Sequence, residues 1–389
     1  MTKSIMVNND GHGVFYTGMY DSKESIERNL EVYRDTFVKV LEWCISLGSK
    51  SNYPSKVTEL IGEDVKEFPR RGDRLLSEVL RRLISSGVDP LRVVIDKCHE
   101  INVKVFPSMR MNPDYNPGWM GEGFAKMYNS RFWWENPHLR IKDRNGRLQT
   151  KLSYAYPEVQ KFKLEVLKEV LNYDIDGLNL DFLRHPPFLG YEDPLIEGFK
   201  KEYGRSPLDL PEDDRRWLRY KARVMTGFLW KLRRILDDVQ KDRGKRLEIS
   251  VRVDHRYYFK QGLDVSRWIR EGLVDKVIVS EHGLGGFVFS LRPFVEMTKG
   301  GPCELYFGEE AVCSGHDLTP EEDRLLAQGK ITESDLRRRK LSLKEYCERA
   351  LRWYKEGADG VHIFNDPHNR EAFKILGDLG KIREFLRRT

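Results

Sequence analysis

The amino-acid sequence predicts a single domain, residues 1–389, folded as a (β/α)8 TIM barrel. Short apolar runs with β character alternate with helical patterns eight times along the chain. Parallel strands joined by right-handed helical crossovers close most naturally into such a barrel, and 389 residues leave room for inserted loops. An open, doubly wound sheet is the alternative, but no glycine-rich phosphate loop follows the first apolar run.

The fourth expected strand is the most informative one. Leu178, Leu180 and Phe182 alternate with Asn179 and Asp181, so one face is apolar and the other is polar. Because amphipathic helical patterns precede and follow this strand, helices should cover the sheet, and the polar face should point into a barrel or cleft. The eight expected strands are Ile5–Asn9, Val38–Cys44, Val103–Met109, Gly177–Phe182, Leu247–Val253, Lys276–Glu281, Glu304–Gly308 and Gly360–Asn365.

Helical patterns separate these strands. The run that starts at Asp73 has leucines at helical spacing and stops at Gly87, and Pro157 stands where a proline in the first helical turn is tolerated. The expected helices are Lys23–Arg34, Asp73–Ser86, Pro90–Glu100, Pro157–Asn172, Leu195–Tyr203, Arg215–Gln240, Val265–Glu271, Leu291–Thr298, Leu343–Glu356 and Arg370–Arg388.

Three connections are too long to be plain turns. Residues 112–156 follow the third strand and are rich in aromatics, and residues 184–214 follow the fourth and are rich in proline. Residues 309–341 follow the seventh, are highly charged, and contain an expected helix at Pro320–Gln328. All three leave the carboxyl ends of strands, which is the face of a barrel where functional residues collect.

Composition indicates a folded, soluble protein. Hydrophobic residues make up 40% of the chain and aromatic residues 11%. No run approaches the roughly 18 apolar residues that a membrane span needs, so we expect no membrane partner. The first residues leave no room for a secretory signal, and we therefore expect a cytoplasmic protein.

Cysteine usage and charge exclude further classes. The five cysteines are scattered and form no CxxC pair, which predicts reduced thiols and neither a disulfide framework nor a structural zinc site. The net charge is +6, from 67 basic and 61 acidic residues that are mostly interleaved. Since a nucleic-acid binder normally shows a concentrated basic stripe, we expect no such partner. A charged fraction of 33% suggests a thermophilic source.

Polar residues stand at the carboxyl end of every expected strand. Such a ring, acidic and rimmed by aromatic side chains, suits a ligand covered with hydroxyl groups, because sugars stack on aromatic rings and hydrogen-bond to carboxylates, amides and guanidinium groups. The residues at these positions are Asn8, Asn9, Asp10, Glu42, Trp43, Arg110, Asn112, Asp181, Arg184, Arg252, Asp254, His255, Glu281, His282, Glu309, Glu310, His362, Asn365 and Asp366.

Cleavage of a glycosidic bond needs an ionised carboxylate and a protonated carboxyl group on opposite sides of the bond. We predict Asp181 as nucleophile or base and Glu281 as acid/base, because strands four and six can face two carboxyl groups across a barrel mouth. Glu309 is the main rival for either role, with Asp254 behind it. Predicted substrate contacts are Asn9, Asp10, Arg110, Asn112, Trp133, Trp134, Asn179, Arg184, Asp254, His282 and Asn365.

Structural roles compete with these assignments. Arg184 could form a structural ion pair with Asp181, and Trp133 and Trp134 could pin the long loop against the barrel. The histidines at 255, 282 and 362 could be satisfied by backbone groups at the edge of the core. Glu310 is expected to be a solvated neighbour of Glu309.

The segment 176–184, DGLNLDFLR, resembles the glycosyl-hydrolase group with family-10-like (β/α)8 domains. Three further segments carry the resemblance, namely MRMN at 109–112, FWW at 132–134 before a proline, and LSY at 152–154 before another. The match runs in order from residue 8 to residue 365. It implies a barrel that acts on an oligo- or polysaccharide, with Asp181, Arg184 and Arg110 lining the site. We expect no cofactor. The absence of a signal favours an intracellular oligosaccharide or glycoconjugate.

Two other classes stay open. Asp254, His255 and Glu281 with His282, together with Asp181 and Glu309, could hold a divalent ion for an isomerase or hydrolase, although the first strand is followed by no HxH motif. A barrel that binds carbohydrate but has lost catalysis is the other class. The linkage, the stereochemical course and the oligomeric state are not determined by the sequence.

Overall fold

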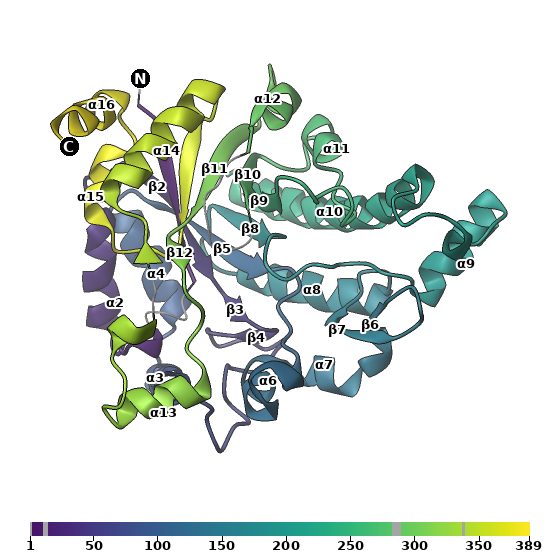
Figure 1. Cartoon of the computed structure of the whole chain (residues 1–389), viewed down its shortest axis with the longest axis horizontal. Helices are drawn as coiled ribbons and strands as arrows, with labels where there is room; N and C mark the ends of the chain where they lie inside the picture. The colour runs from purple at the N-terminus through teal and green to yellow at the C-terminus, as the bar shows by residue number, and fades with distance from the viewer. Residues whose placement is uncertain (1, 11–14, 282–288, 337–338) are drawn as a thin grey trace.

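Eight parallel strands close into a barrel, and helices cover its outside (Figure 1). The computed structural model describes residues 2–10, 15–281, 289–336 and 339–389. Within these ranges the strands follow one another around the ring in sequence order, which confirms the predicted TIM barrel. Each expected strand begins and ends within two residues of an observed one. The strands are β1 (Ser4–Asn9), β2 (Val38–Cys44), β5 (Lys104–Arg110), β8 (Gly177–Asp181), β9 (Glu248–Asp254), β10 (Lys276–Ser280), β11 (Glu304–Glu310) and β14 (Gly360–Phe364).

The covering helices begin and end at residues suited to those positions. The Asp89 side chain accepts hydrogen bonds from the N–H groups of Leu91 and Arg92, and a capping box of Ser342 and Glu345 starts α14. The main helices are α2 (Lys23–Leu30), α3 (Arg71–Ser85), α4 (Pro90–Glu100), α8 (Pro157–Val170), α9 (Asp193–Tyr203), α10 (Arg215–Arg243), α11 (Val265–Arg270), α12 (Arg292–Thr298), α14 (Leu343–Glu356), α15 (Arg370–Ile375) and α16 (Leu379–Arg388).

The prediction of one last helix over residues 370–388 is wrong. The chain breaks between α15 and α16 at Gly377, where a Cβ atom would lie 2.2 Å from the Phe37 side chain. The Asp378 side chain then accepts hydrogen bonds from the N–H groups of Gly380 and Lys381 and caps α16. The close approach of Gly377 to Phe37 and the N-cap at Asp378 therefore divide into two helices the segment that the apolar periodicity predicts as one.

The loops at the carboxyl ends of the strands hold additional structure. The connection after β5 contains α5 (Pro117–Met120), α6 (Glu122–Tyr128), α7 (Arg131–Glu135) and the hairpin of β6 (Arg140–Lys142) and β7 (Leu148–Leu152). The connection after β2, which the sequence did not single out as long, contains the hairpin of β3 (Ser46–Leu47) and β4 (Lys50–Ser51). In Figure 1 these elements gather below the barrel, whereas both termini lie above it.

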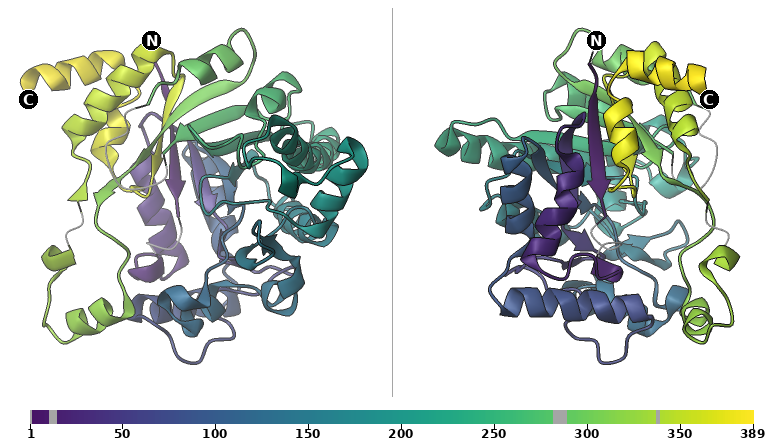
Figure 2. Two further views of the ribbon diagram at one scale, coloured as in Figure 1. Left: turned by 45° about the vertical axis from the view of Figure 1, so that its right-hand side comes forward. Right: turned by 90° about the vertical axis from the view of Figure 1, so that its left-hand side faces the viewer.

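The connection after β11 reaches across to α3. It contains β12 (Val312–Ser314), α13 (Pro320–Ala327) and β13 (Arg339–Lys340), and the expected helix at 320–328 is present. Arg70 donates a hydrogen bond to the carbonyl oxygen of Leu318 at 2.9 Å, and Arg71 pairs with Asp323 of α13 at 3.3 Å. These contacts hold the green α13 segment beside α3 below the barrel (Figure 2).

The inside of the barrel is filled in layers. Met6, Val40, Phe106, Ile278 and Tyr306, from five strands, form a buried cluster separate from the main core between strands and helices. Such a cluster plugs a TIM barrel rather than leaving a pore. Polar side chains from the next inward-facing positions, among them Glu42, Asn179 and His362, lie on the side of this plug that faces the carboxyl ends of the strands.

Candidate active site

The first polar layer is a closed hydrogen-bond network around Glu42. Its Oε1 accepts hydrogen bonds from Asn179 Nδ2 at 2.8 Å and from Ser250 Oγ at 2.9 Å, and its Oε2 pairs with His362 Nε2 at 2.9 Å. Asn179 Oδ1 in turn accepts from Ser108 Oγ at 2.7 Å. Every one of these side chains is buried. The predicted substrate contact Asn179 therefore lies in the floor of the site. His362 contacts a carboxylate through Nε2, while its Nδ1 is buried without a hydrogen-bond partner among the described residues.

Asp181 lies above this floor at the end of β8. Its Oδ1 accepts hydrogen bonds from the backbone N–H groups of Leu183 at 3.0 Å and Arg184 at 3.3 Å. Its Oδ2 pairs with Arg252 Nη1 at 3.3 Å. All of these partners are donors, so Asp181 accepts as a carboxylate. The side chain is 1% exposed, and a charge buried to this degree needs such partners.

Arg252 connects Asp181 to a second carboxylate. Its Nη2 lies 2.6 Å from Glu310 Oε1 and 3.4 Å from Ser280 Oγ, and its guanidinium carbon lies 4.1 Å from the centre of the Phe364 ring. The expectation that Glu310 is a solvated neighbour of Glu309 is wrong. Tyr306, Gly308 and Glu310 alternate along β11, so Glu310 shares the inward face.

Glu309 points the other way. It is buried, and its Oε2 accepts a hydrogen bond from Arg349 Nη1 of α14 at 2.9 Å. Burial raises the pKa of Glu309 to about 8, against the opposing effect of Arg349. The structure thus places Glu309 between the barrel wall and a covering helix, apart from the network that holds Asp181.

Glu281 stands at the rim, directly after β10. It forms an ion pair with Arg256, and the two side chains are 26% and 50% exposed. Asp254 is buried, and its Oδ1 accepts hydrogen bonds from the backbone N–H groups of Arg256 and Tyr257 at 2.7 and 2.8 Å. Asp254 therefore caps the turn after β9, and the predicted contact His282 lies outside the described residues.

The opposite side of the mouth is built from β1 and β5. Arg110 forms an ion pair with Asp10, and its Nη1 donates to Tyr115 Oη at 3.2 Å. Asn9 donates to Tyr20 Oη at 3.1 Å. Asn112 is buried and donates to the carbonyl oxygens of Leu152 at 2.9 Å and Pro187 at 2.8 Å, so it ties two loops together. Asn365 follows β14 with a positive φ of 59°.

Trp133 and Trp134 lie inside the long loop rather than over the mouth. Trp133 is 1% exposed and donates from Nε1 to the carbonyl oxygen of Thr150 at 2.8 Å, under the Arg140 guanidinium at 3.6 Å. Trp134 packs edge-on against it, with ring centroids 4.8 Å apart. Trp133 is covered by the chain itself, whereas Trp134 is only partly buried, so the packing of Trp133 favours a role in pinning the loop.

Arg184 makes no ion pair with Asp181 in the described part of the chain. Its backbone N–H donates to that carboxylate, while its guanidinium carbon lies 4.8 Å from the centre of the Phe364 ring. The strands β8 and β14 stand four places apart in a ring of eight. The Arg184 side chain therefore extends across the barrel mouth. Arg252, Glu310 and Phe364 are the functional candidates that sequence reasoning left unassigned.

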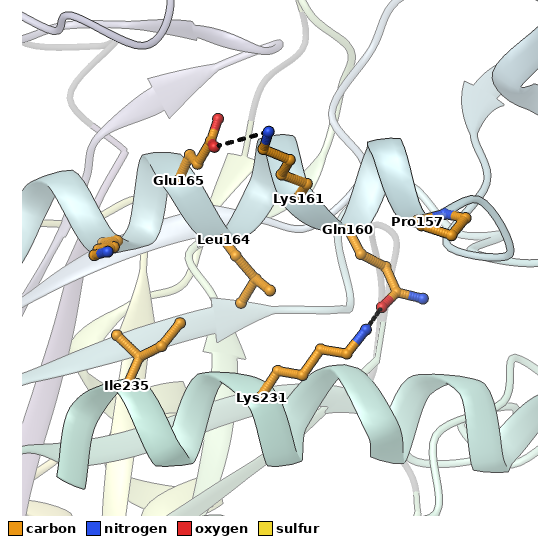
Figure 3. Close-up of a pocket in the computed structure, with 8 residues that line it drawn as sticks. Pro157, Gln160, Lys161, Leu164, Glu165, Lys231 and Ile235 are labelled. Atoms are coloured by element: carbon orange, nitrogen blue, oxygen red, sulfur yellow. Dashed lines mark hydrogen bonds and ion pairs between the residues drawn. The ribbon is translucent and has the colours of Figure 1, made fainter. Parts of the chain in front are cut away.

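Two hollows lie outside this network. One, of about 600 Å³, lies beside the β8 loop and is lined by residues that include Pro187, Leu189, Tyr191 and Lys221. The other, of about 250 Å³, is a groove between α8 and α10, where Leu164 and Ile235 face each other (Figure 3). Neither contains the carboxylates of the mouth.

In residues 2–10, 15–281, 289–336 and 339–389, no three or more His, Cys, Asp or Glu side chains come together as metal ligands. The same residues contain no helix with the length and hydropathy of a membrane span.

Comparison with known proteins gives matches of sequence and of fold. A family model described as "Glycosyl hydrolase-like 10" matches residues 53–281. A curated S-layer-related protein from Niallia circulans is 28% identical over 115 residues, and the match covers 25% of this chain and 7% of that protein. The chain thus spans a small part of the length of this relative.

Among solved structures, the catalytic domain of the psychrophilic chitinase B from Arthrobacter TAD20 matches with a TM-score of 0.50 and 8% identity, covering 100% of this chain and 96% of that one. Chitinase ChiW from Paenibacillus sp. str. FPU-7 matches with a TM-score of 0.49 and 13% identity, covering 99% of this chain and 43% of that one. At an identity of 8%, the match to chitinase B shows a shared barrel fold.

Proposed function

Because the chain belongs to the glycosyl hydrolase-like 10 family, we propose that it is a glycoside hydrolase that cleaves an oligo- or polysaccharide at the carboxyl end of its barrel. The observation that carries this proposal is the environment of Asp181. The carboxylate at the end of β8 is buried, and it is held by two backbone N–H groups and by Arg252. This arrangement suits the ionised member of a catalytic carboxyl pair.

Asp181 acts in this proposal as the nucleophile or as the base that activates water. Its donors fix the carboxylate in one orientation, and a fixed carboxylate stabilises the positive charge that develops on the sugar ring in the transition state.

Glu281 acts as the acid/base. A general acid must reach the departing oxygen and must be able to take up a proton. Glu281 is partly exposed, and its partner Arg256 is half-exposed, so a bound glycan can displace that ion pair. Glu310 is less suited to act as the acid, because its Oε1 lies 2.6 Å from Nη2 of the buried Arg252.

The test is sugar release from a panel of α- and β-linked glycans, with and without chelator, by the wild type and by Asp181→Asn, Glu281→Gln and Glu309→Gln. We expect Asp181→Asn to lose about 10³-fold in turnover with sugar binding intact. Glu281→Gln should lose turnover on glycans but recover on aryl glycosides whose leaving group needs no protonation. Glu309→Gln should match the wild type.

Other outcomes would redirect the proposal. Full activity of Asp181→Asn would remove that residue from catalysis. Binding of glycans without any turnover would indicate a carbohydrate-binding barrel, and loss of wild-type activity in chelator would indicate a metal-dependent enzyme.

A further inference from the structure

The arginines at the barrel mouth differ in how their charge is neutralised. Among the described residues, Arg110 pairs with Asp10, and Arg252 pairs with both Asp181 and Glu310. Arg184 has no carboxylate within ion-pair distance in the same part of the chain. Its guanidinium is in contact with an aromatic ring, and its Nε is buried without a hydrogen-bond partner.

The position of Arg184 makes this difference informative. The backbone N–H of Arg184 is bonded to Asp181, and its guanidinium lies above Phe364 on the far side of the barrel. A group bound by this guanidinium would therefore lie in the same barrel mouth as Asp181, on the side of Phe364. The side chain is neither fully buried nor fully exposed, so a ligand can reach its outer edge.

A partly desolvated guanidinium without a counter-charge is unfavourable unless something else supplies the charge. Phe364 supplies an attractive ring face for a cation, but it offers no acceptor for the N–H groups. The planar fork of arginine binds a carboxylate through two parallel hydrogen bonds. A neutral hydroxyl group would fill one acceptor position and leave the charge uncompensated.

We propose that Arg184 binds a carboxylate substituent of the substrate, and that the glycan cleaved at Asp181 contains an acidic sugar that is bound in the barrel mouth. This inference rests on the proposed function for the location of the scissile bond, but the charge preference can be measured by binding alone. The carboxylate of the acidic sugar would replace solvent and form an ion pair with Arg184, as the Asp10 carboxylate does with Arg110.

The experiment compares acidic oligosaccharides with their carboxyl-reduced forms, which keep the linkage and lose the charge. The probes are oligomers of galacturonate, glucuronate and mannuronate, together with glycan strands that contain N-acetylmuramic acid. Binding is measured by calorimetry on the full chain carrying Asp181→Asn, at about 50 mM salt so that screening stays modest. Arg184→Gln and Arg184→Lys are added to this background.

We expect at least one acidic probe to bind tenfold or more tightly than its reduced form. Arg184→Gln should abolish that difference and leave the affinity for the reduced form within about twofold, while Arg184→Lys should keep part of it. Arg216→Gln, which removes an exposed charge at the start of α10, is the matched control and should keep the whole difference. Thermal melting of each variant checks folding.

Two results would overturn the inference, namely equal binding of every acidic probe and its reduced form, or a charge preference that survives in Arg184→Gln. Its failure can be told apart from failure of the proposed function. If the wild type hydrolyses neutral glycans but shows no charge preference, the hydrolase stands without an acidic substrate. If an acidic probe binds through Arg184 but no probe is cleaved, the carboxylate site stands and the hydrolase fails.

Discussion

Arg252 is the residue whose replacement should most affect the site. It is fully buried and joins Asp181 to Glu310 through contacts of 3.3 and 2.6 Å. In Arg252→Met the thioether fills most of the volume, so the main loss is electrostatic. Asp181 keeps its two backbone donors. Glu310, by contrast, loses the one side-chain partner that the described residues provide.

Removal of one partner from a buried ion pair costs about 3–5 kcal/mol, because it leaves a buried charge without compensation. We expect Arg252→Met to lower the free energy of unfolding by an amount in this range, mainly through Glu310. If so, adding Glu310→Gln should restore about half of the loss or more, since it removes the uncompensated charge. The two substitutions should therefore be strongly non-additive.

The assay is urea denaturation at pH 7 of the wild type, the two single variants and the double variant. Arg388→Met removes an exposed i,i+4 pair with Glu384 and serves as the control, with an expected loss below about 0.5 kcal/mol. A loss below about 1 kcal/mol for Arg252→Met, or no recovery in the double variant, would refute the reasoning that Arg252 holds two buried charges.

Three further predictions concern other parts of the chain. Burial raises the pKa of Glu309 to about 8 from an ordinary value of 4.5, so its contribution to stability is fully present below pH 4.5 and is lost as the pH rises through 8. The free energy of unfolding of Glu309→Gln should therefore rise relative to that of the wild type over this pH range. A constant difference in Tm between the two proteins from pH 5 to pH 9 would contradict this. Gly48→Ala should cost more than about 1 kcal/mol beyond Gly146→Ala, because both have positive φ but a Cβ atom at Gly48 would lie 2.1 Å from the Tyr128 carbonyl oxygen, whereas one at Gly146 meets nothing within 4 Å; equal losses in thermal melts would show that the clash relaxes. Glu42→Leu should destabilise by about 3 kcal/mol or more, because it removes the acceptor of three buried side chains; a near-neutral effect in urea would mean that water replaces the carboxylate.

The fold could be predicted from the sequence because two periodicities alternate along the chain. The helix Pro90–Glu100 has its expected bounds, and in the structure Asp89 caps its start and Pro90 occupies its first turn. The prediction failed at residues 370–388, where an amphipathic pattern continues through a break. That break depends on how closely Gly377 approaches Phe37, which is a tertiary contact and not a local signal.

The site was harder to predict because adjacent residues on a strand face opposite ways. Glu309 and Glu310 are chemically alike, and the choice between them depends on which of them shares a face with Tyr306 and Gly308. That alternation is present in the sequence, where Tyr306, Gly308 and Glu310 stand two residues apart. The burial of Trp133 could not be predicted from strand alternation, because it depends on the β6–β7 hairpin packing against this side chain.

The contacts of Arg252 also show why the two carboxylates of the mouth should not be treated as independent groups. Asp181, Arg252, Ser280 and Glu310 belong to β8, β9, β10 and β11, which are consecutive in the barrel. One guanidinium therefore fixes the ends of four neighbouring strands relative to one another. Because Glu281 follows Ser280 directly in the chain, the contact between Arg252 and Ser280 also helps to position the backbone of Glu281, the proposed acid. A substitution at Glu310 should thus change the geometry between Asp181 and Glu281 even though Glu310 itself need not touch the substrate.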